Sequence, residues 1–172
     1  MPSLAAGASD PGTSSVMIPQ GTAVGNLYII AKADGEGIVS ETSETNNIYA
    51  KSIQIGPDLD ITALSAPASA SAGQSIAITD TTKNQGGEAA GPFRTQFFLS
   101  TNTVLDASDI LLGSRDLPSL AAGASSSGST SVMIPQGTAV RTWYIIAKAD
   151  GEGIVTETSE ANNTYARTFK VI

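Results

Sequence analysis

Residues 144–163 read YIIAKADGEGIVTETSEANN, and residues 28–47 repeat this stretch as YIIAKADGEGIVSETSETNN. Each copy begins with a short run of alternating apolar side chains, continues through a glycine-rich acidic segment and ends in two asparagines. Alternation is typical of a strand, and Asp-Gly followed closely by another glycine favours a turn. The stretch therefore predicts a strand, an acidic turn and the beginning of a second strand, present twice in one chain.

The repetition extends well beyond this stretch. Residues 1–56 align without gaps on residues 117–172, an offset of 116, and 17 differences leave 39 of the 56 positions identical. Such a period is that of a small domain rather than of a solenoid unit. We therefore expect residues 57–172 to form one complete repeat and residues 1–56 to be the second half, the last three strands, of a preceding repeat. Because Met1 stands where the complete repeat has Leu117, we expect a fragment of a longer array.

The composition excludes several classes of function. The 172 residues include 9 Lys and Arg, 16 Asp and Glu, no His and no Cys, which gives a net charge of -7. A nucleic-acid partner would require clustered basic residues. Without His there is no serine triad, and without Cys there are no disulfides or zinc-thiolate sites. No apolar run approaches the roughly 20 residues that span a bilayer, so we expect no membrane insertion. Because the sequence contains no catalytic constellation, we also expect that the protein is not an enzyme.

Turn signals at intervals of about ten residues predict a β-sandwich within the complete repeat. The expected strands begin at Leu59, Gln74, Phe93, Ile110, near Val132, at Trp143 and near Tyr165. Trp143, Ile145 and Ala147 alternate along the sixth strand, so we interpret Trp143 as a core residue rather than a sugar platform. The fold class that follows is all-β: an immunoglobulin-like, seven-stranded antiparallel sandwich, in tandem.

A resemblance to a known family can be stated on five segments. They are residues 57–59 (PDL), 83–86 (KNQG), 97–101 (FFLST) with Leu105-Asp106, 111–113 (LLG) and 155–163 (VTETSEANN). Together they resemble the CARDB domain, a cell-adhesion-related domain of bacteria and archaea, over all of 57–172 and the second half of it in 1–56. The resemblance implies a seven-stranded sandwich that occurs in tandem in large surface or secreted proteins, and it implies no enzyme activity.

Residues 1–56 alone leave an apolar face without a cover. The inward set would be Val16, Ile18, Leu27, Ile29, Tyr49, Ile53 and Ile55. Leaving these side chains in water forfeits on the order of 10–20 kcal/mol, which is comparable to the whole stability of a domain. We expect a homo-oligomer in which the same half of a second copy covers this face. The alternative is that the half packs on its own neighbour. The short junction at residues 55–58 predicts a semi-rigid rod rather than loosely linked domains.

The acidic turn is the best candidate site. Its carboxylates are Asp34, Glu36, Glu41 and Glu44 in the first copy and Asp150, Glu152, Glu157 and Glu160 in the second, each followed by two asparagines. Calcium takes six to eight oxygen ligands of these kinds, although the spacing is not that of an EF-hand. The alternative is a solvated hairpin turn whose asparagines bond to the backbone.

The function that we expect is a non-enzymatic structural or adhesion repeat of a bacterial surface or secreted protein, with a calcium-stiffened turn and neighbouring repeats as partners. The alternative is a carbohydrate- or protein-binding module that uses an exposed sheet face, for which Tyr144 is the candidate contact.

Overall fold

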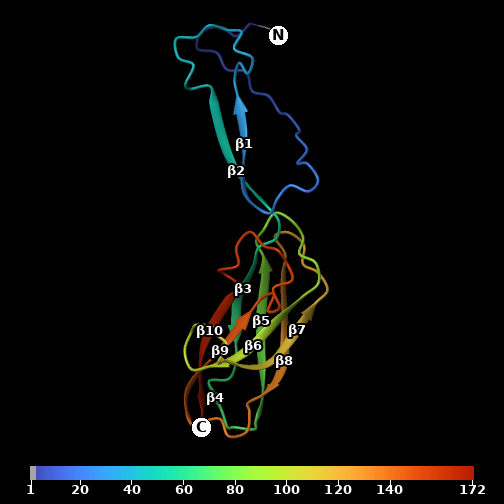
Figure 1. Ribbon diagram of the computed structural model, residues 1–172, viewed down its shortest axis with the longest axis vertical. Helices are drawn as coiled ribbons and strands as arrows, with labels where there is room; N and C mark the ends of the chain where they lie inside the picture. The colour runs from blue at the N-terminus through green and yellow to red at the C-terminus, as the bar shows by residue number, and fades with distance from the viewer. Residues whose placement is uncertain (1–2) are drawn as a thin grey trace.

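The computed structural model describes residues 3–172, which form strands and no helix. A two-stranded hairpin lies at one end of the elongated molecule, and the remaining strands form a sandwich at the other end (Figure 1). The hairpin consists of β1 (Gly25–Lys32) and β2 (Ile48–Ile55). The sandwich contains β3 (Leu59–Ser65), β4 (Ser69–Ala70), β5 (Ser75–Asn84), β6 (Phe93–Ser100), β7 (Ile110–Leu117), β8 (Ser125–Met133), β9 (Arg141–Lys148) and β10 (Thr164–Val171).

The sandwich has two sheets. One contains five strands in the order β4-β10-β9-β6-β7, and the other contains β3-β5-β8. All neighbouring strands are antiparallel except β4, which pairs in parallel with β10. The all-β prediction is confirmed. This part of the chain has eight strands, because the expected turn at residues 67–73 contains the two-residue β4, which joins the other sheet.

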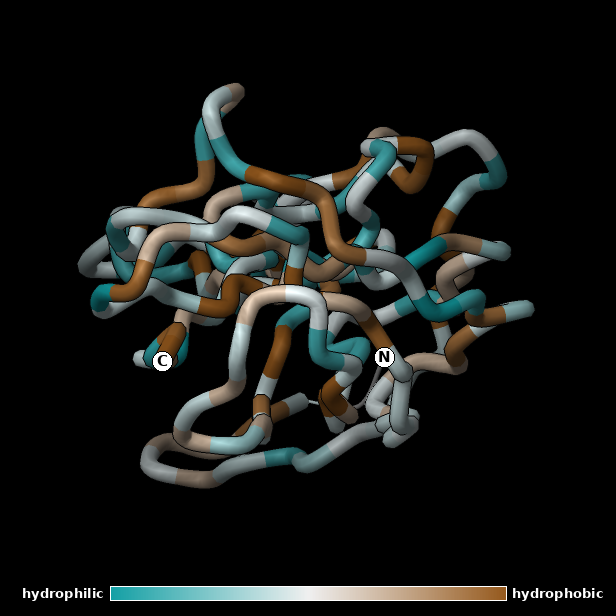
Figure 2. Tube along the Cα trace, turned by 90° about the horizontal axis from the view of Figure 1, so that it is seen from below, coloured by the Kyte–Doolittle hydropathy of each residue, from teal (hydrophilic) through white to brown (hydrophobic). Residues whose placement is uncertain are grey.

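The core lies between the two sheets and uses the alternating positions that the sequence marks as inward. Leu59, Ile78, Phe97 and Ile145 are fully buried, and Trp143 is buried as expected of a core residue. Figure 2, which looks along the long axis, shows brown apolar stretches alternating with white and teal, more polar ones along the chain. Burial of this alternating set supplies the main driving force for the sandwich.

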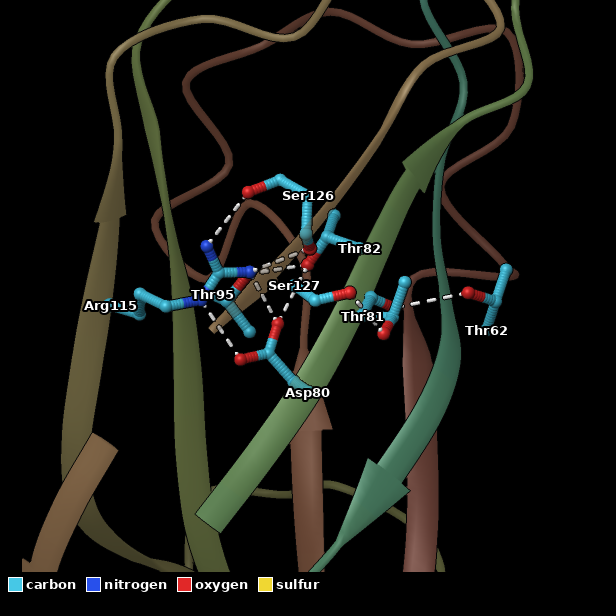
Figure 3. Close-up of polar contacts among 8 residues, drawn as sticks. All are labelled: Thr62, Asp80, Thr81, Thr82, Thr95, Arg115, Ser126 and Ser127. Carbon is cyan, nitrogen blue, oxygen red and sulfur yellow. Dashed lines mark hydrogen bonds and ion pairs between the residues drawn. The ribbon is translucent and has the colours of Figure 1, made fainter. Parts of the chain in front are cut away.

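A polar network joins the two sheets inside this core (Figure 3). Arg115 on β7 donates to both carboxylate oxygens of Asp80 on β5, from Nη2 at 2.6 Å and from Nε at 2.9 Å. It also donates to the side chain and the carbonyl oxygen of Ser126 on β8, at 3.1 and 3.2 Å. Thr82 on β5 connects Asp80 to Thr95 on β6. Because Asp80 is 1% exposed, it would be an uncompensated buried charge without the arginine.

Residues 3–56, the part of the expected half repeat that the structure describes, form two strands, not the three that we predicted. Residues 9–17 form no strand, whereas their counterparts 125–133 form β8. The difference has a physical cause, since β8 pairs along its whole length with β5 and residues 9–17 have no such partner. The counterparts of Asp10 and Pro11, Ser126 and Ser127, lie within β8.

The expected open face of the half repeat is confirmed in most of its members. The exposed fractions of Val16, Ile18, Ile29 and Tyr49 are 67%, 40%, 40% and 72%. Two members differ: Ile53 is half-buried, and Ile55 is 7% exposed at the junction with the sandwich.

The buried ion pair generates a prediction about stability. Arg115→Met keeps the apolar stem but leaves Asp80 buried and unpaired, so we expect the free energy of unfolding to fall by roughly 3–5 kcal/mol. Arg94→Met is the matched control, because Arg94 pairs with Asp116 and Glu152 at the surface, and exposed pairs contribute about 0–1 kcal/mol. Urea titration of both variants measures the difference. Equal losses of stability in the two variants would contradict the prediction that the buried pair contributes more than the exposed pairs.

Candidate functional site

The backbone of the acidic turn is set by two residues with positive φ. Asp150 follows β9 with a φ of 43°, and Gly153 has a φ of 64°. Asp is one of the few non-glycine residues that tolerate this region, because its side chain can bond locally to the backbone. Here the Gly153 amide donates to the Asp150 carbonyl at 2.9 Å, and the Val155 amide donates to Asp150 Oδ2 at 2.8 Å. The sequence therefore folds locally into a closed acidic turn.

One carboxylate oxygen of Asp150 remains unpaired inside this turn. Asp150 is 0% exposed, and its Oδ1 has no hydrogen-bond partner. Asn163 at the end of the stretch is 1% exposed, and its Oδ1 is likewise unpaired. An unsatisfied buried acceptor costs about 1–3 kcal/mol, and more when it is charged. Two such oxygens in one turn identify a place where a donor or a cation would lower the free energy.

Two further carboxylates lie against Asn163. Its side-chain amide donates to Glu157 Oε1 at 2.9 Å and to Glu160 Oε2 at 3.3 Å. The other oxygen of Glu157 accepts from the amide of Leu59, the first residue of β3. The turn thus holds the strand that follows the junction, although almost a hundred residues separate them in the chain.

The pKa of Glu157 is raised from 4.5 to about 7. Burial is the largest cause, and the negative charges of Glu160 and Asp150 add to it, while the hydrogen bonds from Leu59 and Asn163 oppose it. Glu160 and Asp150 therefore lie near enough to Glu157 for their charges to disfavour its ionised form. A positive ion among them would reverse that repulsion.

The fourth predicted residue of this copy lies elsewhere. Glu152 pairs with Arg94 at 3.0 Å, and Arg94 also binds Asp116 at 2.6 Å. These three side chains line a hollow of about 410 Å³ together with Pro92, Phe93, Leu117, Pro118 and Ile154. The structure therefore places Glu157 and Glu160 on Asn163, keeps Asp150 near enough to act on Glu157 electrostatically, and separates Glu152 from them.

The first copy has a similar local arrangement without its partner strand, except that both carboxylate oxygens of Asp34 are paired. Asp34 also has a φ of 43°, and its carboxylate accepts from the amides of Ile38 and Val39 at 2.9 and 3.0 Å. The Asn47 amide donates to Glu41 at 2.7 Å and to Glu44 at 3.3 Å. Glu36, the counterpart of Glu152, is exposed on the same turn.

Carboxylates alone do not complete a metal site in either copy. Within residues 3–172, no three His, Cys, Asp or Glu side chains converge closely enough to hold a metal ion. A cation at the turn would therefore also use amide and backbone carbonyl oxygens, which calcium accepts readily.

A second set of hydrogen bonds fixes the junction between the hairpin and the sandwich. Asp58, which is 4% exposed, accepts from the side chains of Asn162 at 2.8 Å and Gln85 at 3.2 Å. The side-chain oxygen of Asn84 accepts from the amides of Asp58 and Gly86 at 3.1 and 3.0 Å. Residues 55–59 are all buried, so the junction is part of the packed structure rather than a loose linker.

Two glycines allow the chain to pass close to this junction. A Cβ on Gly86 would lie 2.5 Å from the carbonyl oxygen of Gly56, and a Cβ on Gly87 would lie 2.5 Å from that of Gln54. The Gly87 amide instead donates to the Gly56 carbonyl at 3.0 Å. The sequence signals these residues only as a strand break, and their role at the junction depends on contacts between distant segments.

Sequence reasoning also missed Asp80, Arg115 and Asn84, which hold the sandwich together. Lone charged or amide residues in a polar stretch give no signal of burial. The only available signal is positional, since Asp80 occupies the same alternation as Ile76 and Ile78 on β5.

The fold and this site define an all-β sandwich module whose acidic turn holds the strand that follows the junction. The family model of CARDB matches residues 1–51 and 56–167, so the chain belongs to the CARDB family. The family is a cell-adhesion-related, non-catalytic module associated with cell surfaces.

Solved structures agree with the fold. A CARDB domain from Pyrococcus furiosus, crystallised in complex with di-metal ions, is 19% identical with a TM-score of 0.52, and the match covers 68% of this chain and 90% of that one. A domain from Methanosarcina acetivorans, assigned to a cell surface protein, is 22% identical with a TM-score of 0.51 and covers 69% of this chain and 94% of its own. At these identities the likeness concerns the fold.

The comparison with curated proteins gives no match. Nowhere in residues 3–172 does a helix occur that could cross a bilayer.

The raised pKa of Glu157 generates a prediction about pH. Between pH 4.5 and 7 the folded state holds a proton that the unfolded state has released, so the contribution to stability is full below pH 4.5 and is lost as the pH rises through 7. We expect the ionisation of Glu157 to lower the free energy of unfolding by on the order of 2 kcal/mol between pH 4.5 and 8. Urea titrations across that range, in EDTA, measure it.

Glu157→Gln separates this group from the other carboxylates. The difference in free energy of unfolding between wild type and Glu157→Gln should change by about 2 kcal/mol between pH 4.5 and 8. Glu152→Gln is the control: Glu152 lies outside the cluster, so this substitution should leave the pH profile unchanged. A pH-independent difference for Glu157→Gln would show that the carboxyl group does not titrate in this window.

The junction generates a second prediction. Gly86→Ala places a methyl group against backbone atoms on residues 56–58, so we expect a loss of roughly 1–3 kcal/mol and a wider range of hairpin orientations. Gly91→Ala is the control, because a Cβ there meets nothing within 4 Å. Residual dipolar couplings of β1 and β2 relative to the sandwich measure the orientation. An unchanged range in Gly86→Ala would mean that these contacts do not fix the junction.

Proposed function

We propose that the chain serves as a structural spacer of an extracellular or cell-surface adhesion protein, and that neighbouring repeats of that protein are its partners. The observation that carries this proposal is the junction, where Glu157 and Thr158 bind the residues that begin the sandwich. The Thr158 amide donates to the Pro57 carbonyl at 2.9 Å, next to the bond from Leu59 to Glu157. A module that orders its own linker transmits orientation from one unit to the next.

We further propose that calcium occupies the acidic turn and stiffens this junction. The unpaired oxygens of Asp150 and Asn163 support the proposal, because both are buried acceptors without a donor. The repulsion that Asp150 and Glu160 exert on Glu157 supports it as well, since a divalent cation would replace repulsion by attraction. The related domain from Pyrococcus furiosus is described as a complex with di-metal ions.

The stiffening would follow from the position of Glu157. One of its oxygens is bonded to the first amide of β3, so an ion that fixes the carboxylate also fixes that strand. Bound calcium would keep Glu157 ionised at neutral pH and remove the destabilisation that its raised pKa implies. The turn of the first copy supplies the same residue types at Asp34, Glu41 and Glu44.

The alternative binding function has a specific location in the hollow beside the turn. Arg94, Asp116 and Glu152 line it, but these charges are already engaged with one another. The sheet face of Tyr144 offers less, because its neighbour Ile146 is fully buried. The spacer function is therefore the better supported of the two.

Calcium binding is directly testable. If the dissociation constant falls at about 10⁻⁴ M, as in extracellular modules, 10 mM calcium should stabilise the protein by about 2.7 kcal/mol and raise its melting temperature. Calorimetric titration and thermal unfolding with calcium, and with magnesium for selectivity, measure the effect.

Asp150→Asn should abolish most of the calcium-dependent rise in melting temperature, because it removes the buried charge while keeping the size of the side chain. Glu152→Gln is the matched control and should keep the rise, since Glu152 pairs with Arg94 instead. If 10 mM calcium produces neither heat nor a change in the melting temperature of the wild-type protein, the metal proposal is refuted. The spacer function would then be tested by the residual dipolar couplings at the junction.

A further inference from the structure

We propose that the open face of residues 3–56 binds one specific occupant, the first half of another repeat, a segment with the chemistry of residues 57–116 that includes an arginine equivalent to Arg115. The inference rests on the proposed repeat architecture and is independent of calcium. Three observations support it, and each comes from comparing a position in the half repeat with the same position in the complete one.

The hairpin of the half repeat already has the strand pairing of its counterpart in the complete repeat. β1 pairs with β2 from Gly25↔Ile55 to Lys32↔Ile48, and β9 pairs with β10 from Arg141↔Val171 to Lys148↔Thr164, which is the same register displaced by 116. The turn bonds are also repeated, since the Ala33 and Ala149 amides both donate to the asparagine that ends the stretch at 2.8 Å. The hairpin is therefore preorganised for a partner of the same kind.

The positions left open in the half repeat are those that residues 57–116 cover in the complete one. Ile18 is 40% exposed and Ile134 is 0% exposed, while Ile29 is 40% exposed and Ile145 is 0% exposed. In the sandwich, β6 pairs along the edge of β9, whereas the equivalent edge of β1 is free. The missing cover is thus a set of strands equivalent to β3, β5, β6 and β7.

Residues 10–12, which we call the arginine seat, are the counterparts of residues 126–128, where Arg115 lies in the complete repeat. The half repeat itself contains no arginine. In the complete repeat, Arg115 crosses β8 at Gly128, where a Cβ would lie 2.5 Å from its Cδ. The counterpart Gly12 meets nothing within 4 Å, so its lack of a side chain has no local purpose. Ser126, which accepts from Arg115, is replaced by Asp10, a stronger acceptor for a guanidinium group.

The same seat argues against a symmetric pair of half repeats. Residues 1–56 contain no arginine, and their only basic side chains are Lys32 and Lys51, which lie on β1 and β2. A second copy of this half would cover apolar area but would leave Asp10 and Gly12 without their ligand. The first half of another repeat would cover the apolar face and would also supply the arginine for residues 10–12.

The experiment adds a second copy of residues 57–116 in front of the full chain. The occupant should complete a strand at residues 9–17, so their amide protons should gain protection from hydrogen exchange by about a hundredfold or more, approaching that of residues 125–133. The extended protein should be a monomer. The sandwich of residues 57–172 serves as the internal control for folding, and EDTA removes any metal effect.

Gly12→Ala tests the seat in both proteins. The substitution should leave exchange at residues 13–32 unchanged in the original chain and lower their protection at least about tenfold in the extended chain, as a clash with the added arginine requires. Replacing that added arginine by alanine should remove the sensitivity to Gly12→Ala.

Two results would overturn the proposal. In the first, residues 9–17 stay unprotected in the extended chain although residues 57–172 are folded. In the second, the original chain is a dimer in which residues 9–17 are already protected, so a second copy is the occupant. Neither result bears on the calcium site proposed at Asp150, which lies in the complete repeat.

Discussion

The hydrogen bond from the Leu59 amide to Glu157 is the contact on which the arrangement of the molecule depends. It joins the acidic turn to the first residue of the sandwich, directly after the junction. The bonds from Thr158 to Pro57 and from Asn162 to Asp58 act beside it. Because residues 157–162 come from the turn and residues 57–59 from the junction, the last part of the repeat orients the first part. The direction in which the chain leaves the hairpin is set by the module itself.

The same contact carries an energetic cost that makes it responsive. Glu157 must be buried to reach the amide, and burial near Asp150 and Glu160 raises its pKa to about 7. A proton relieves that cost, and the calcium ion that we propose would relieve it too, at the position that holds the junction. The core polar pair differs, because Arg115 already compensates Asp80. The charge of Asp80 is therefore balanced by Arg115, whereas within residues 3–172 no positive charge balances the carboxylates around Glu157.

Much of the fold could be predicted from the sequence, because alternation identifies the inward residues of β5, β6 and β9 and the internal repeat identifies the domain period. The acidic turn could be located as well. The sequence could not separate Glu152 from its neighbours, since its partner Arg94 comes from β6. The extra strand expected near Val16 failed for the same reason: a polar strand such as β8 exists only beside β5. Local pattern predicts which face a residue takes, while partners determine whether a strand forms.

The parallel pairing of β4 with β10 has a mechanical consequence. The chain enters the sandwich beside the hairpin and ends at its far end (Figure 1). Tension applied between those ends would pull β4 and β10 in opposite directions along their length. The amides of Lys170 and Ile172 donate to Ala68 and Ala70, each at 3.0 Å, so these bonds would bear the load together in shear rather than open one at a time. Such a geometry suits a link that must withstand pulling.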